Sequence, residues 1–69
     1  MEIIRLREDY IKLGQALKAA GLVESGVEAK AVILEGLVKV NGETEVRRGR
    51  KLYENDIVEL ANETIKIEK

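Results

Sequence analysis

The stretch that decides the fold is residues 25–51, which read SGVEAKAVILEGLVKVNGETEVRRGRK. Ser25 followed three residues later by Glu28 is the capping-box pattern, in which the hydroxyl accepts from the Glu28 amide and the carboxylate accepts from the Ser25 amide. This pattern predicts a helix over residues 26–35 that ends at Gly36. After Gly36 the apolar residues alternate with polar ones, so we expect a strand to follow the helix.

A hairpin is predicted directly after this helix. The dipeptide Asn41-Gly42 separates two short segments, residues 37–40 and 43–46. Asn-Gly is the strongest short-range hairpin signal because both residues accept the positive φ that a type I′ turn requires. These two segments are therefore expected to pair as antiparallel strands.

The N-terminal part is expected to add an edge strand over residues 3–7, a connection over residues 8–11 and a first helix that ends at Gly21. The apolar face of that helix consists of residues spaced at i, i+3, i+4 and i+7, which are Leu13, Ala16, Leu17 and Ala20. The connection between the two helices is only four residues long, which predicts a compact and steeply crossed pair.

The second helix is expected to carry Val27, Ala31 and Leu34 on one side. Two more strands are predicted over residues 57–60 and 64–67, and Asn55 is expected to adopt the left-handed conformation in the turn before them. This order predicts a single α+β domain over residues 1–69, in which the helix pair packs on a small, bent, mostly antiparallel sheet of four to five strands.

Composition excludes several kinds of chemistry. The chain has no cysteine and no histidine, which removes thiol nucleophiles, the histidine general base and the usual zinc ligands. Glu43 and Glu45 are two residues apart on a predicted strand, so we expect them to share one exposed face rather than to form a catalytic pair. We expect no enzyme activity, no cofactor and no metal.

The location of the protein follows from similar reasoning. No apolar run approaches the roughly 20 residues that a membrane span needs, so no membrane partner is expected. The first seven residues alternate charged and apolar side chains, which is unlike a signal peptide. A cytoplasmic monomer is the expectation.

The basic run after the hairpin suggests an anionic partner. Four cations fall within five residues, Arg47, Arg48, Arg50 and Lys51. Residues 37–51 carry five basic and two acidic groups, although the whole chain has a net charge of −1. One interpretation is phosphate binding by these side chains. The other is a solvated turn whose charge is balanced by neighbouring glutamates.

Tyr10 and Tyr53 are the only aromatic residues. Proteins that grip single strands stack bases on several exposed rings, and two tyrosines are too few for such a surface. We expect Tyr53 to pack at the edge of the core. If the partner is RNA, its backbone shape and phosphate positions are the features that this chain would recognise.

The chain resembles the S-four RNA-binding domain over residues 11–60. The resemblance rests on the order of a helix pair, a capping box and a Val-Asn-Gly hairpin, and it is carried by Leu13-Gly14-Gln15, Leu17-Lys18, Gly21-Leu22-Val23, Ser25-Gly26, Glu28-Ala29-Lys30, Ile33, Gly36, Val38, Val40-Asn41-Gly42 and Asp56-Ile57-Val58. The basic run with Leu52-Tyr53 is similar to the small stand-alone bacterial members of YaaA/YbcJ type.

The resemblance implies the alpha-L RNA-binding motif and binding of structured RNA, ribosomal or transfer RNA, with ribosome assembly as one expected context. Ribosomal proteins are a further expected partner, because the acidic C-terminal third suits a basic protein surface. The residues implied in RNA contact are Gln15, Lys18, Ser25, Gly26, Lys30, Lys39 and Asn41, and the similarity to the stand-alone members adds Arg47, Arg48, Arg50 and Lys51. Many members carry an arginine where this chain has Gly26, which implies one cation fewer for RNA.

A different class of function stays open. A Val-Asn-Gly hairpin followed by a turn and a terminal strand also occurs in ubiquitin-like sulfur carriers, which would make the chain a protein-interaction module. Those carriers end in Gly-Gly, whereas this sequence ends in Ile67-Glu68-Lys69. A plain protein-binding role for the acidic C-terminal third is the remaining alternative.

Overall fold

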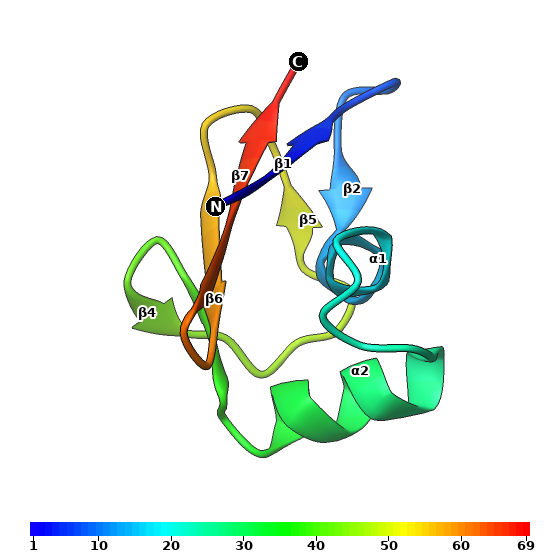
Figure 1. The fold of residues 1–69 in the computed structure, drawn as a ribbon, viewed down its shortest axis with the longest axis vertical. Helices are drawn as coiled ribbons and strands as arrows, with labels where there is room; N and C mark the ends of the chain where they lie inside the picture. Colours follow the sequence, from blue (N-terminus) through cyan, green and yellow to red (C-terminus); the bar gives the residue numbers. More distant parts are fainter.

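A computed structural model describes residues 1–69, and it confirms the α+β class: two helices pack with a mostly antiparallel five-stranded sheet and a two-stranded ribbon (Figure 1). The elements are β1 (Glu2–Arg5), β2 (Ile11–Lys12), α1 (Leu13–Ala19), α2 (Gly26–Leu34), β3 (Val38–Val40), β4 (Glu43–Thr44), β5 (Lys51–Leu52), β6 (Ile57–Leu60) and β7 (Glu63–Glu68).

The five strands of the main sheet lie in the order β1-β7-β6-β3-β4. All neighbours are antiparallel except β1 and β7, which pair in parallel, with Ile4 opposite Ile67. The expected N-terminal strand is therefore present, shifted to residues 2–5, and it lies beside the C-terminal strand at one edge of the sheet.

The two-stranded ribbon corrects the sequence-based prediction. Residues 8–11 were expected to be a connection, but Ile11 and Lys12 form β2, which pairs antiparallel with β5. Two-residue strands are too short to produce a period of two in the sequence. The ribbon matters for function because it places the end of the basic run, Lys51, opposite Lys12.

The helices cross steeply, as expected: Figure 1 shows α1 end-on while α2 lies across the view. Leu13, Ala16 and Leu17 of α1 are fully buried, as the spacing predicted. For α2 the predicted face is wrong. Val27 and Leu34 are 80% and 61% exposed, whereas the buried residues of the helix are Ala29 and Ile33.

The α2 error has a physical cause. Six of the nine residues of α2 are apolar and they surround the helix, so periodicity alone does not say which side faces the core. Packing against α1 and the sheet selects Ala29 and Ile33, which are four residues apart and lie on one face.

The turns have the backbone conformations that the sequence predicts. Asn41 and Gly42 have φ of 53° and 85°, as a type I′ hairpin requires, and Asn55 has φ of 77°.

Neither helix has the length and apolar character that crossing a membrane demands.

Candidate nucleic-acid interface

The loop that carries the basic run is anchored to the start of α1. The backbone amides of Leu13 and Gly14 donate to the carbonyls of Arg50 and Arg48, at 2.8 and 3.2 Å. These amides belong to the first turn, where the helix offers them no carbonyl of its own, and Lys12 supplies no side-chain cap. The loop therefore takes the place of a cap for α1.

Gly14 allows this approach. A Cβ at this position would lie 2.9 Å from Cγ of Arg48, closer than such atoms come in proteins. The aliphatic part of the Arg48 side chain therefore packs directly against the backbone of α1. This contact holds Arg48 beside α1.

A pocket of about 330 Å³ opens at this place. Its walls come from the end of β2, α1, the first part of α2 and the loop, and the lining residues are Lys12, Gly14, Gln15, Lys18, Gly26, Ala29, Arg48 and Gly49. Three of the eight are cations and none is acidic. The pocket thus concentrates positive charge in a chain whose net charge is negative.

The N-terminus of α2 forms one wall of the pocket. The hydroxyl of Ser25 accepts from the Glu28 amide at 3.1 Å, as the capping box predicts. The reciprocal bond differs from the prediction: the Glu28 carboxylate accepts from the Glu24 amide at 2.7 Å and not from Ser25. The amides of Gly26 and Val27 have no acceptor within the protein. They remain available to an anion at the positive end of the helix dipole.

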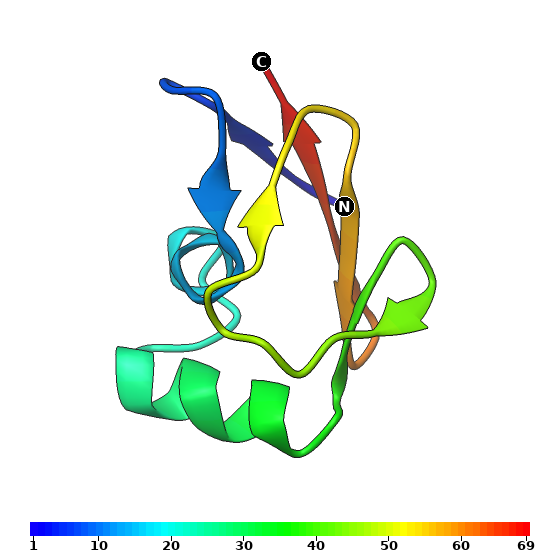
Figure 2. The same ribbon diagram turned by 180° about the vertical axis from the view of Figure 1, so that it is seen from behind.

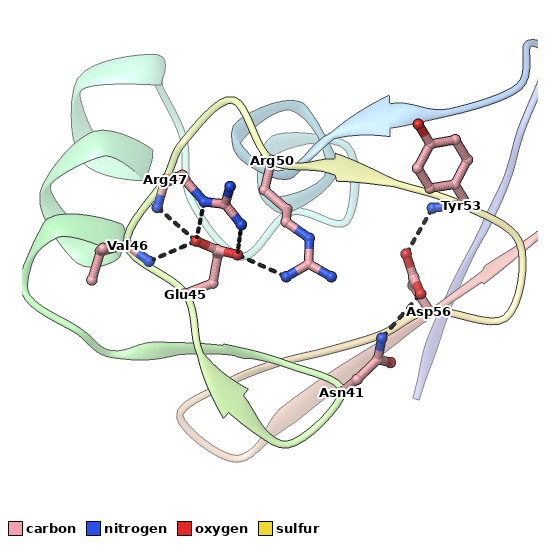
Figure 3. A network of polar contacts seen from close by, with 7 residues as sticks. All are labelled: Asn41, Glu45, Val46, Arg47, Arg50, Tyr53 and Asp56. Atoms are coloured by element: carbon pink, nitrogen blue, oxygen red, sulfur yellow. Dashed lines mark hydrogen bonds and ion pairs between the residues drawn. The ribbon is translucent and has the colours of Figure 1, made fainter.

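Glu45 organises the rest of the loop (Figure 3). Its side chain is only 8% exposed, and its carboxylate accepts from the guanidinium groups of Arg47, at 2.9 and 3.0 Å, and Arg50, at 2.7 Å. It also accepts from the backbone amides of Val46 and Arg47, each at 3.1 Å. The expectation that Glu43 and Glu45 share an exposed face is wrong, because strand β4 ends at Thr44 and Glu45 turns inward.

The hydrogen bonds from Arg47, followed by those from Arg50, lower the pKa of Glu45 to about 2. Glu45 is therefore ionised at every physiological pH. Its charge offsets those of Arg47 and Arg50, whereas Arg48 forms no ion pair. Three arginines that look alike in the sequence thus have two different environments.

The structure brings four of the predicted contact residues together in the pocket: Gln15, Lys18, Gly26 and Arg48. Ser25 caps the adjacent helix end, and Lys30 is exposed one turn further along α2 without lining the pocket. Arg47 and Arg50 form ion pairs with Glu45 and do not line the pocket. The pocket accounts for a minority of the predicted residues, and the RNA-binding role of all of them stays a prediction.

Lys39 and Asn41 lie elsewhere. Figures 1 and 2 place the β3–β4 hairpin on the opposite side of the molecule from α1. The Asn41 side chain is occupied in holding the turn before β6: its Nδ2 donates to Asp56 at 3.0 Å, and its Oδ1 accepts from the Ile57 amide at 2.9 Å. Asn41 therefore has a structural role within the fold.

The tyrosines also correct the prediction. Tyr53 was expected at the edge of the core, but it is 49% exposed and packs against Tyr10, with ring centroids 6.1 Å apart. Nζ of Lys51 lies 4.8 Å from the Tyr10 ring centroid, within the range of a cation–π contact. Lys51 thus belongs to this aromatic cluster rather than to the pocket.

Two residues of the site were missed from the sequence. Lys12 lines the pocket, and its spacing to Gln15 and Lys18, at i, i+3 and i+6, extends the polar side of α1 and could have indicated it. Glu45 was expected only as one of the neighbouring glutamates that balance the charge of the basic run. Its burial just after β4 was not expected, because nothing in the local sequence distinguishes it from an exposed glutamate.

Comparison with known proteins adds a family and two relatives. The family described as "S4 domain", the S-four domain, matches residues 4–68. A Bacillus subtilis (strain 168) protein named "Probable ribosome maturation protein RlbA" is 47% identical over 57 residues, covering 83% of this chain and 80% of the relative. The "Putative RNA-binding protein YbcJ" of Escherichia coli (strain K12) is 34% identical over 61 residues, covering 88% and 87%.

Proposed function

The chain belongs to the S4 domain family, and from this premise we propose that it binds structured RNA without catalysing a reaction on it. The RNA would be ribosomal or transfer RNA, and the role would be in ribosome maturation. A cytoplasmic, monomeric protein belongs to the same proposal. The names of the two relatives, one for ribosome maturation and one for RNA binding, support this proposal.

The observation that carries the proposal is the acid-free pocket between the two helices, into which Lys12, Lys18 and Arg48 bring positive charge. Gly26, whose amide has no acceptor within the protein, lines the same pocket at the start of α2. A phosphate fits such a site because charged side chains and helix N-terminal amides both donate hydrogen bonds to its oxygens. Gly26 and Gly49 in the wall let an RNA backbone approach closely.

Phosphate contacts position a protein on a nucleic acid but carry little sequence information. The pocket offers one amide side chain, Gln15, and no aromatic ring. We therefore propose that the pocket recognises the fold of the RNA backbone, and that bases contribute little at this place.

The test is direct binding of an RNA hairpin, followed by fluorescence anisotropy. Arg48→Ala and Lys18→Ala should each weaken binding by about tenfold, the effect of losing a hydrogen bond to a charged group. Arg5→Ala is the matched control: it removes one exposed cation paired with Glu68 outside the pocket, and it should leave affinity within about twofold. The thermal midpoint should stay unchanged in all three variants.

Equal losses from all three variants would mean that net charge, not the pocket, determines binding. No measurable affinity of the wild-type protein for RNA would overturn the proposed function itself.

A further inference from the structure

The outer face of the β2–β5 ribbon carries four exposed side chains, Tyr10, Lys12, Lys51 and Tyr53. Only Lys12 among them lines the pocket. We propose that this face is a second subsite, at which an unpaired base of the bound RNA stacks on Tyr53. The inference rests on the proposed function, because it extends the path of the RNA beyond the pocket.

The first observation is the placement of the two lysines. Lys12 and Lys51 lie directly opposite each other in the ribbon, and neither forms an ion pair with an acidic residue. Like charges at directly opposite positions destabilise a pair of strands. This arrangement is favourable when an anion binds between the two ammonium groups, and a phosphate of the RNA would do so.

The second observation is the state of the rings. Tyr10 already has Lys51 over its ring, whereas Tyr53 is 49% exposed and its ring has a tilted contact with that of Tyr10. The backbone amide of Tyr53 donates to Asp56 at 2.8 Å. Figure 3 shows the ring on the side of β5 away from that carboxylate. The strand is thus fixed while the ring faces outward, as a base-stacking residue requires.

The third observation is continuity. Lys12 belongs both to the pocket and to the ribbon, so a phosphate bound in the pocket and one bound at Lys51 are neighbours along one surface. A strand leaving a double-stranded stem held at the pocket would pass Lys12 and Lys51 and reach Tyr53. Two tyrosines are too few to grip a long single strand, but they are sufficient for one base.

The experiment compares two RNA hairpins with the same stem, one blunt and one carrying an unpaired uridine tail of about four nucleotides, the lower end of known single-strand site sizes. The wild-type protein should bind the tailed hairpin about fivefold or more tightly than the blunt one, the lower end of what one stacked base contributes. Tyr53→Ala should abolish this preference. Tyr53→Phe keeps the ring and should retain it.

A second readout needs no variant. The chain has no tryptophan and both tyrosines lie in this cluster, so intrinsic fluorescence reports on the subsite alone. The tailed hairpin should quench tyrosine fluorescence, and the blunt hairpin should quench it much less.

Equal affinity for the two hairpins, with unequal effects of Arg48→Ala and Arg5→Ala, would overturn the subsite and leave the proposed function standing. If the Tyr53→Ala protein still prefers the tailed hairpin, whatever its stability, the subsite is also overturned. Failure to bind either hairpin would overturn both proposals.

Discussion

Arg48 and Arg50 show how strongly neighbours decide the role of a residue. Both lie in the same loop two positions apart, yet Arg50 is 2.7 Å from a buried carboxylate and Arg48 lies at the cationic pocket. A guanidinium that is already paired offers fewer donors and less net charge to RNA. Arg47 and Arg50 therefore mainly hold the loop through Glu45, whereas Arg48 is the arginine of the loop that we propose for RNA contact.

Glu45 should contribute to stability in a pH-dependent way. Its pKa is about 2 in the folded protein and near 4.5 without these partners. Because the folded-state pKa is the lower one, its stabilisation is complete above about pH 5 and is lost as the pH falls toward 2. Partial exposure of the arginines reduces the effect, so Glu45→Gln should cost about 1–3 kcal/mol at pH 7.

Urea unfolding of the wild type and of Glu45→Gln between pH 7 and 2 measures this directly. The two unfolding free energies should converge at the acidic end. Glu43→Gln is the control, because Glu43 is exposed on the preceding strand and makes no hydrogen bond or ion pair through its side chain. A constant difference between wild type and Glu45→Gln at all pH values would contradict the role of the charge.

At the scale of elements, the sequence predicted what local chemistry decides. Ser25 with Glu28 predicted where α2 begins, and Asn41-Gly42 predicted the hairpin, because caps and turns depend on residues close in the chain. The buried side of α2 and the β2–β5 pairing depend on contacts between distant residues. The pocket belongs to the second kind: its residues come from α1, α2 and the loop, and only packing unites them.

The start of α2 offers a prediction of its own. Gly26 lines the pocket, and a Cβ built there meets no atom within 4 Å. Gly26→Arg would add a cation at the edge of the pocket, so it should strengthen RNA binding several-fold. It should also increase the magnitude of the slope of log K against log salt concentration by about one, as one additional phosphate contact would.

Gly26→Glu is the matched control for this prediction, because it has a similar helix propensity and the opposite charge. The helix dipole favours the glutamate at this position, so Gly26→Glu should be at least as stable as Gly26→Arg. Its RNA affinity should nevertheless fall below that of the wild type. Thermal unfolding and anisotropy together separate the two effects. If the RNA affinities of the two variants instead changed in the same order as their stabilities, the substitutions would affect binding only by changing how stably the protein folds.

At the scale of the whole molecule, a net charge of −1 is compatible with RNA binding because the pocket segregates three cations in a lining that has no acidic residue. The molecule measures 28 × 22 × 19 Å, whereas the Debye length at physiological salt is about 8 Å. Acidic groups around the far hairpin and along the C-terminal strands are thus largely screened from an anion at the pocket. The composition of the chain alone could not predict this, since it records the number of charges and not their positions.

This segregation predicts how binding depends on salt. The three pocket cations and Lys51 would neutralise about four phosphates, which gives a slope of about −3 to −4 for log K against log salt concentration. Arg48→Ala should reduce the magnitude of the slope by about one. Arg5→Ala, which removes a cation paired with Glu68, should leave the slope unchanged although the net charge changes equally. Anisotropy titrations of one RNA hairpin across a salt series measure all three slopes. An affinity that does not vary between low and moderate salt would exclude phosphate contacts as the basis of binding, because releasing condensed counterions necessarily makes binding depend on salt.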